Sequence, residues 1–226
     1  PGPLVADQWF RRFVVDAQCG SIATDPIIIS VSNLTLYGND TPSVIATSYG
    51  VPLDLGTEFR TVSDGIITKV RLFSGADERG IHQIRLWRKN DNSEYELFAG
   101  PYDWDVQSET AGWKEYNLNS PVQVEAFRYY MVSVSTSEDN LWAFSSNYVP
   151  ASSNNYINYT GSYYIGPIGQ VPSWPADENS GFFRDVVFIP FSPGSAGVSQ
   201  EICYNSIPAP LTETAEPSGA SGDYTY

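Results

Sequence analysis

Hydrophobic and polar residues alternate with a period of two in several short stretches of the chain. The alternation occupies residues 69–73, 82–87, 122–126 and 130–134, and an apolar-rich stretch at residues 182–189 closes the series. Such patterns are typical of β-strands. Turn-forming residues lie between them, at 63–65, 74–75, 89–92 and 119–121, and no segment has the pattern of an amphipathic helix of three turns. We therefore expect an all-β protein, an antiparallel β-sandwich of jelly-roll or immunoglobulin-like type.

The same patterns divide the chain into three segments. We expect an N-terminal extension over residues 1–50, the β-sandwich over residues 51–192 and an irregular C-terminal tail over residues 193–226. Within the sandwich, residues 145–181 are rich in Asn, Ser, Tyr, Gly and Pro, which predicts long loops with one hairpin around residues 156–165. The tail has no Lys or Arg, and residues 208–226 have the composition of a segment that is disordered on its own.

The N-terminal extension holds one predicted strand, over residues 27–36. Its apolar positions change phase near Asn33, which indicates an irregularity within the strand. An extra strand must pair with a sheet edge, either in its own molecule or in a neighbour. We expect this extended arm to join subunits, through the apolar residues Ile27, Ile28, Ile29, Val31, Leu34 and Leu36.

Composition and charge exclude several classes of function. The 226 residues include 26 acidic and 12 basic ones, so the formal charge is 12 − 26 = −14. This balance argues against binding to nucleic acid or to an anionic membrane surface. No apolar run approaches the length of a membrane span. Only 17% of the residues are charged, while 14% are aromatic, a composition that suggests a secreted or cell-surface β-rich protein.

Two further features suit an extracellular location. Cys19 and Cys203 are the only cysteines. In an extracellular context we expect them to form a disulfide, within one chain or between subunits; the alternative is two unrelated buried thiols. Three Asn-x-Ser/Thr sequences make Asn33, Asn39 and Asn158 candidate N-glycosylation positions if the source is a eukaryote, and chance alone would supply one or two of them.

The middle of the chain resembles the domain-of-unknown-function 4082 family. The resemblance spans about residues 51–192 and depends on the order and spacing of several motifs: Leu55-Gly56-Thr57-Glu58-Phe59, residues 65–73, Gly80-Ile81-His82, Leu86-Trp87, Gly112-Trp113, Ser120-Pro121-Val122, Tyr129-Tyr130 and residues 183–188. The resemblance implies a β-sandwich of secreted and cell-surface proteins, often beside carbohydrate-active modules. It implies no catalytic residues.

Candidate catalytic chemistry is sparse. His82 is the only histidine, and acid–base or zinc chemistry usually needs several His or Cys side chains. His82 and Asp185 both fall in the inward phase of their predicted strands, so we expect them to form a hydrogen-bonded pair with a structural role in the core. The acidic pairs at Asp103 and Asp105, at residues 138–139 and at residues 177–178 fit solvated loops better than a glycosidase or a calcium site. We therefore expect no enzymatic activity, no cofactor and no bound metal.

Aromatic residues are the stronger signal. Eight lie in predicted loops or edges, where they could stack on sugar rings or contact another protein, although packing in the core explains any single one of them. Tyr102, Trp104, Tyr163 and Trp174 are the main candidates. The sequence favours an extracellular structural protein, a self-assembling subunit of a helical fibril whose partners are copies of itself joined head to tail. The alternative is a carbohydrate-binding accessory module, whose partners are glycans.

Overall fold

The computed structural model describes residues 33–48, 50–150, 155–177 and 180–191 together with their side chains. It describes the backbone of residues 8–10, 13–16, 20–23, 27–29, 195–196 and 213–215. The chain divides into two compact units. One is Asn33–Ile189, and the other combines Pro1–Ser32 with Pro190–Tyr226.

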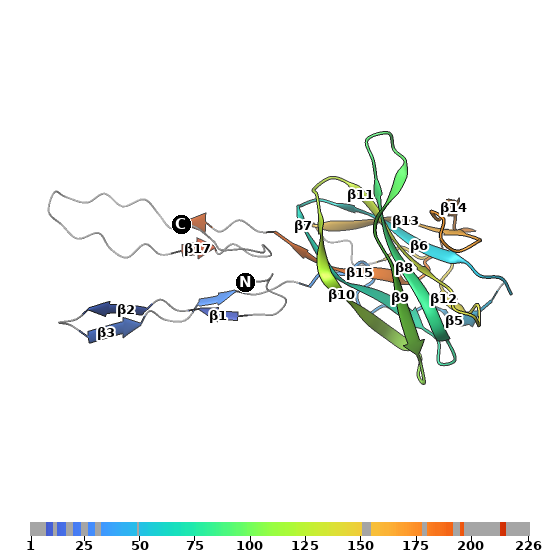
Figure 1. Cartoon of the computed structure of the whole chain (residues 1–226), viewed down its shortest axis with the longest axis horizontal. Helices are drawn as coiled ribbons and strands as arrows, with labels where there is room; N and C mark the ends of the chain where they lie inside the picture. Colours follow the sequence, from blue (N-terminus) through green and yellow to red (C-terminus); the bar gives the residue numbers. More distant parts are fainter. Residues whose placement is uncertain are drawn as a thin grey trace. The chain divides into compact units, whose positions relative to one another are not determined.

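The larger sheet of the Asn33–Ile189 unit has six antiparallel strands, in the order β14-β13-β6-β11-β8-β9 (Figure 1). Strand β11 lies in the middle of this sheet, and six of its seven residues are buried. Strand β9 forms an edge, and most of its residues remain partly or fully exposed. The six strands are β14 (Trp174–Pro175), β13 (Ile157–Ile165), β6 (Asp54–Thr61), β11 (Tyr129–Ser135), β8 (Arg79–Lys89) and β9 (Tyr95–Gln107).

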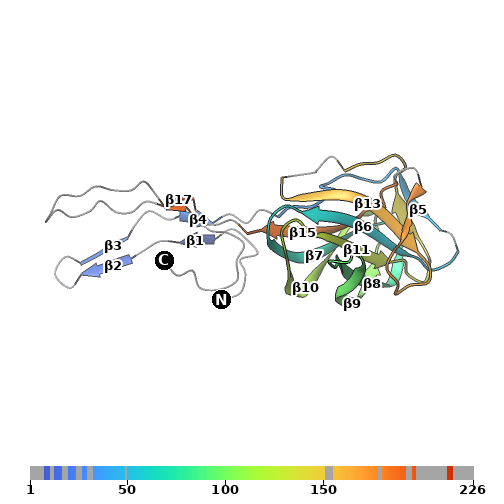
Figure 2. The ribbon, with the colours of Figure 1, turned by 90° about the horizontal axis from the view of Figure 1, so that it is seen from above.

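The smaller sheet has three antiparallel strands in the order β10-β7-β15. They are β10 (Gly112–Val124), β7 (Gly65–Ser74) and β15 (Arg184–Pro190). A separate pair joins β5 (Val44–Thr47) to β12 (Trp142–Phe144). The strands of both sheets can be followed from a second direction in Figure 2. Among the described residues the structure contains no α-helix.

The core lies between the two sheets and follows from the alternation in the sequence. Val70 and Leu72 of β7 are fully buried, as are Ile84 of β8 and Val132 of β11, and all four belong to one hydrophobic cluster. Fully burying an aliphatic side chain contributes about 1.5–3 kcal/mol. The antiparallel β-sandwich predicted from the alternating pattern is confirmed.

The sandwich begins earlier than the sequence pattern suggested. Leu34 forms an antiparallel bridge with Phe188 of β15 through two backbone hydrogen bonds of 2.8 Å. Leu36 and Tyr37 are fully buried in the core. Residues 33–48, predicted as part of an extension, therefore belong to the Asn33–Ile189 unit. The phase change near Asn33 marks the place where the apolar pattern becomes that of the core.

The described terminal residues form three two-stranded pairs. Strand β1 (Gln8–Phe10) pairs with β4 (Ile27–Ile29). Of the strand predicted over residues 27–36, the structure thus has residues 27–29 in β4, whereas Leu34 and Leu36 belong to the sandwich. The other pairs join β2 (Phe13–Asp16) to β3 (Gly20–Ala23) and β16 (Ser195–Ala196) to β17 (Glu213–Ala215). Val31 and both cysteines, with the expected disulfide, lie outside the described residues.

One predicted turn is a bulge. Residues 119–121 were expected to separate two strands, but they lie inside β10, where the pairing with β7 shifts between Asn117 and Val122. Proline lacks the N–H that a sheet ladder uses, and edge strands and bulges tolerate it. Because β10 is an edge strand, Pro121 interrupts the pairing locally and the strand continues.

Candidate functional site

The Asn33–Ile189 unit contains a cavity of about 420 Å³. Its walls come from parts of the chain that are distant in sequence, namely β5, β6, β12, β13 and the segment that precedes β15. The cavity is lined by Thr47, Ser48, Leu53, Leu55, Trp142, Phe144, Ser146, Tyr164, Asp177, Ser180 and Phe182. Its chemistry is that of a small-molecule site, with apolar and aromatic walls and a few polar groups.

Aromatic rings held at steep angles to one another form the apolar part of this cavity. The ring of Phe182 lies 5.4 Å from Trp142 at 86° and 6.1 Å from Tyr164 at 88°. Trp142 and Phe182 are almost completely buried, and both belong to a second, smaller hydrophobic cluster with Leu53 and Leu55. Tyr164 is half-buried. A rigid aromatic wall of this kind offers a face for the apolar side of a sugar ring.

Polar groups complete the lining of the cavity. The hydroxyls of Thr47, Ser48 and Ser146 and the carboxylate of Asp177 belong to residues that the solvent reaches, whereas Ser180 is buried and donates its hydroxyl to the Asp177 carbonyl at 2.7 Å. Hydroxyls both donate and accept hydrogen bonds, and a carboxylate accepts them. The lining can therefore bind the hydroxyl groups of a ligand as well as its apolar face.

The four aromatic candidates from the sequence do not form one site. Tyr102 and Trp104 lie on β9, where their rings pack 6.1 and 5.8 Å from Tyr116 of β10. Tyr163 and Trp174 lie on β13 and β14, at the opposite edge of the six-stranded sheet.

Of the four, Trp174 packs against a residue that lines the cavity. It is 52% exposed, and its ring lies 5.6 Å from the cavity residue Tyr164, edge to face. Tyr163 adjoins Tyr164 on the same strand, so it faces the other side of the sheet.

Sequence reasoning missed Trp142, Phe144 and Phe182 as lining residues. The short apolar run at 142–144 was a signal of a buried strand, but only pairing with β5 brings that strand to the cavity.

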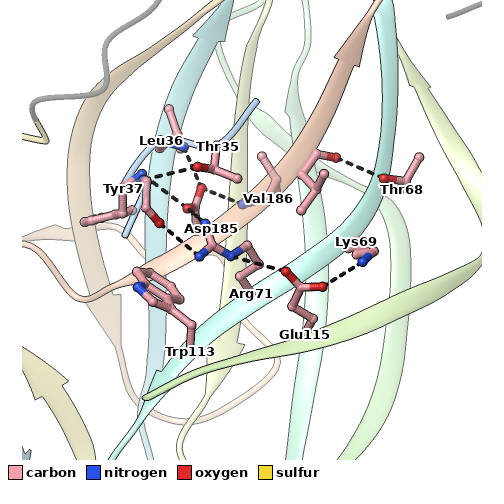
Figure 3. Close-up of polar contacts among 12 residues, drawn as sticks. Thr35, Leu36, Tyr37, Thr68, Lys69, Arg71, Trp113, Glu115, Asp185 and Val186 are labelled. Atoms are coloured by element: carbon pink, nitrogen blue, oxygen red, sulfur yellow. Dashed lines mark hydrogen bonds and ion pairs between the residues drawn. The ribbon is translucent and has the colours of Figure 1, made fainter. Parts of the chain in front are cut away.

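Asp185 is the centre of a buried polar network that attaches the N-terminal end of the sandwich to β15 (Figure 3). Its Oδ1 accepts hydrogen bonds from the backbone N–H groups of Leu36 and Val186, and its Oδ2 accepts one from that of Tyr37. Burial raises the pKa of Asp185 to about 6, against the opposite effect of these donors and of Arg71. The Asp185 side chain thus accepts the hydrogen bonds of the Leu36 and Tyr37 N–H groups in place of a backbone carbonyl, at the point where segment 34–37 leaves the sheet.

Arg71 of β7 completes this network. Its Nη1 donates to Asp185 Oδ2 at 3.1 Å, and its Nη2 donates to the Gly38 carbonyl at 2.9 Å. The guanidinium lies 4.3 Å from the centre of the Trp113 ring, and its Nε is 3.8 Å from Glu115. Arg71 is almost fully buried, while Glu115 is exposed. The arrangement is structural, because a buried ion pair that stacks on an aromatic ring fixes geometry.

The expected hydrogen-bonded pair of His82 and Asp185 does not form. Both residues are fully buried, as the alternation predicted, but the oxygens of Asp185 bind the groups described above. His82 Nδ1 lies 2.7 Å from the carbonyl of Ser135, and its Nε2 has no hydrogen-bond partner. His82 lies on β8 of the six-stranded sheet and Asp185 on β15 of the three-stranded sheet. Both side chains point into the core, but this alone does not bring them into contact.

The three candidate glycosylation positions differ in exposure. Asn33 and Asn39 are exposed, and Asn39 lies in a turn. Asn158 is half-buried and paired with Arg60 inside the six-stranded sheet. The hydroxyl of Thr160, in the same sequence motif, donates to the Glu58 carboxylate at 2.6 Å. Asn33 and Asn39 are therefore the more accessible positions.

The described residues hold neither a cluster of metal ligands nor a membrane-spanning helix. No group of three or more His, Cys, Asp or Glu side chains gathers there in a way that could hold a metal ion. Nor does this part of the chain contain a helix long and apolar enough to cross a membrane.

Comparison with known proteins places the sandwich in a family. No curated protein matches the chain. The model of a family described as a domain of unknown function, DUF4082, matches residues 39–183, which is more than half of the chain and nearly all of the Asn33–Ile189 unit. The motifs at Leu55 and Gly112 that carried the resemblance lie inside this match. The chain belongs to the DUF4082 family.

Proposed function

We propose that this protein is a non-enzymatic extracellular structural protein, the subunit of a helical fibril in which the N-terminal extension of one copy joins the next. One observation carries the proposal. The described terminal strands form two-stranded pairs in a unit separate from the sandwich. A lone two-stranded ribbon is at best marginally stable in water, and three or more strands, or packing against another element, are needed. Another copy can supply what these ribbons lack.

The sequence of the first ribbon supports the same conclusion. Its register pairs Trp9 with Ile28 and Phe10 with Ile27, so both pairs are apolar. Successive residues of a strand face opposite sides, so such a ribbon has apolar positions on both of its faces. A contact that covers them in a head-to-tail arrangement does not close on itself, and such contacts propagate as a helical filament.

The long edges of the sandwich are less suited to assembly. Strand β9 has Pro101 in its interior and the acidic residues Glu96, Asp103 and Asp105 along its length. Strand β10 has Pro121 at its bulge. Proline, charge and bulges on edge strands hinder pairing with other chains. Assembly through the terminal strands therefore fits the chain better than pairing of sandwich edges.

Negative-stain electron microscopy tests this function. The full chain should form regular fibres, and a chain that begins at residue 33 should stay monomeric while its far-ultraviolet circular dichroism spectrum retains the sandwich signal. A matched control, Tyr129→Ser on the exposed surface of β11, should leave the fibres intact. Fibres from the chain that lacks residues 1–32, or a full chain that remains a monomer, would contradict the proposal.

A carbohydrate-binding function is the second candidate, and the cavity beside Tyr164 supports it. A volume of about 420 Å³ with aromatic walls and several hydroxyls suits one or two sugar rings. Glycan-array binding that is lost in Tyr164→Ala or Trp174→Ala, and kept in Trp104→Ala at the opposite edge of the sheet, would favour this module. Unchanged binding in all three variants, or no binding by the wild type, would count against it.

A further inference from the structure

Three charged or polar side chains converge in the interior of the sandwich, and several of their polar atoms form no hydrogen bond. Glu78 precedes β8, His82 lies on β8, and Arg184 begins β15; all three are 0% exposed. Glu78 Oε1, His82 Nε2 and the Nε and Nη2 atoms of Arg184 form no hydrogen bond. A buried polar group without a partner costs about 1–3 kcal/mol, and more when it is charged, so several together require an explanation.

The distances between these atoms are too long for direct hydrogen bonds. Glu78 Oε1 lies 3.8 Å from Arg184 Nη2 and 3.9 Å from His82 Nε2. Polar atoms separated by slightly more than 3.5 Å are commonly bridged by a water molecule, which needs two to four polar partners. The other atoms of these side chains have partners: Glu78 Oε2 accepts from the Gly75 N–H, and Arg184 Nη1 donates to the Phe182 carbonyl.

The protonation of His82 follows from its one hydrogen bond. The Ser135 carbonyl can only accept, so Nδ1 at 2.7 Å from it carries the proton. Nε2 of the neutral ring is then an acceptor. Burial, with a contribution from the charge of Arg184, lowers the pKa of His82 to about 4, which agrees with a neutral ring. The site therefore presents two acceptors, His82 Nε2 and Glu78 Oε1, and the two donors on one edge of the Arg184 guanidinium.

We propose that Glu78, His82 and Arg184 form a binding site for a single buried water molecule. Water donates two hydrogen bonds, here to Glu78 Oε1 and His82 Nε2, and accepts up to two, here from Arg184 Nε and Nη2. Other small occupants fail: a halide has no proton for the two acceptors, and ammonium has no lone pair for the guanidinium. A metal ion would meet the charge of Arg184 and only one carboxylate.

The position of this water gives it a structural role. His82 belongs to the six-stranded sheet and Arg184 to the three-stranded sheet. The water therefore links the two layers of the sandwich to the turn at residues 75–78. The water completes the hydrogen bonds of Glu78 and Arg184, which offsets part of the cost of burying these polar groups.

The single histidine makes the proposal directly testable by NMR on the full chain. Long-range ¹H–¹⁵N spectra should show a proton on Nδ1 and a hydrogen-bonded acceptor at Nε2. A water-selective experiment should give a cross-peak from a long-lived water to the ring proton Hε1, which adjoins both ring nitrogens. A high-resolution crystal structure should show one water within hydrogen-bond distance of all three side chains.

Two amide variants add a matched comparison. Glu78→Gln should shift the ¹⁵N resonance of His82 Nε2, because it changes the partner of the same water, whereas Glu115→Gln at the exposed surface should leave this resonance unchanged. A proton on Nε2 of the wild type would overturn the proposal. So would a crystal structure in which the three side chains bond directly to one another with no water between them.

Discussion

Asp185 on β15 and Arg71 on β7 form a buried ion pair, with Oδ2 of the carboxylate 3.1 Å from Nη1 of the guanidinium. The pair lies between neighbouring strands of the smaller sheet. The same carboxylate binds the backbone of Leu36 and Tyr37. The Asp185 side chain thus connects the first residues of the sandwich with its last strand. Leu36 and Tyr37 precede Asp185 by 149 and 148 positions in the sequence.

Removing this carboxylate should destabilise the sandwich strongly. Asp185→Asn removes the buried counter-ion of Arg71 and leaves only the exposed Glu115, 3.8 Å from Nε. Breaking a buried pair by removing one partner costs about 3–5 kcal/mol. Urea unfolding followed by tryptophan fluorescence measures the loss. The control is Glu96→Gln, which removes the exposed partner of Arg88 and should cost no more than about 1 kcal/mol. Equal losses in the two variants would contradict the structural role of Asp185.

His82 should remain neutral down to an unusually low pH. The pKa of its imidazole falls from 6.5 to about 4 in the folded chain because burial penalises the charged form. The chemical shift of Hε1, followed by NMR from pH 7 to pH 3.5, should therefore show no titration near 6.5. A midpoint near 6.5 in the folded protein would show that the ring is solvated.

The same shift affects stability. Between about pH 6.5 and 4 the unfolded chain binds a proton at His82 that the folded chain does not. The free energy of unfolding should therefore decrease as the pH is lowered through this range, by up to about 3 kcal/mol. The Asp185 carboxyl acts in the opposite direction between about pH 6 and 4, because its pKa is raised in the folded chain. Comparing the pH dependence of the wild type with that of His82→Gln isolates the histidine contribution. Identical slopes would contradict this assignment.

Gly65 should not accept a side chain. A Cβ at this position would lie 2.3 Å from Cε2 of Phe188 and 2.4 Å from the carbonyl oxygen of Ile189, and a backbone atom cannot easily move away. Gly65→Ala should therefore destabilise the protein by about 1–3 kcal/mol, as measured by thermal unfolding.

Gly161→Ala is the matched control for this substitution. Its Cβ would approach only the outer end of the half-buried Tyr163 ring, at 3.0 Å, which can shift. We expect a clearly smaller loss of stability than at Gly65. If Gly65→Ala proves no more destabilising than the control, the close contact between β7 and Phe188 is not as tight as described.

Much of the fold could be predicted from local patterns. The alternation around Val70, Ile84 and Val132 predicted strands that the structure contains as β7, β8 and β11. The hairpin expected around residues 156–165 was wrong, because residues 157–165 form the single strand β13, whose neighbour β14 lies further along the chain at Trp174–Pro175. Period-two alternation shows that one face of a strand is buried. It can be recognised within a few neighbouring residues, so a single sequence is enough to predict the strand.

The site was less predictable, because it depends on contacts between distant segments. The phase of Leu36 relative to Ile29 suggested an irregular strand, whereas burial against the aromatic core decides that Leu36 belongs to the sandwich. His82 and Asp185 share an inward phase, yet their partners are Ser135 and Arg71. Sequence patterns show that a polar residue is buried, and they do not show which polar group it meets.

The sequence by itself determined the all-β class, the acidic charge balance and the family resemblance. Alternation, charge and motif spacing are properties of the chain alone. Only the tertiary structure decided which rings line the cavity beside Tyr164, where the sandwich begins and how Glu78, His82 and Arg184 converge. These features depend on the packing of two sheets. This packing brings together residues that are far apart in the sequence, and no local pattern shows that they will meet.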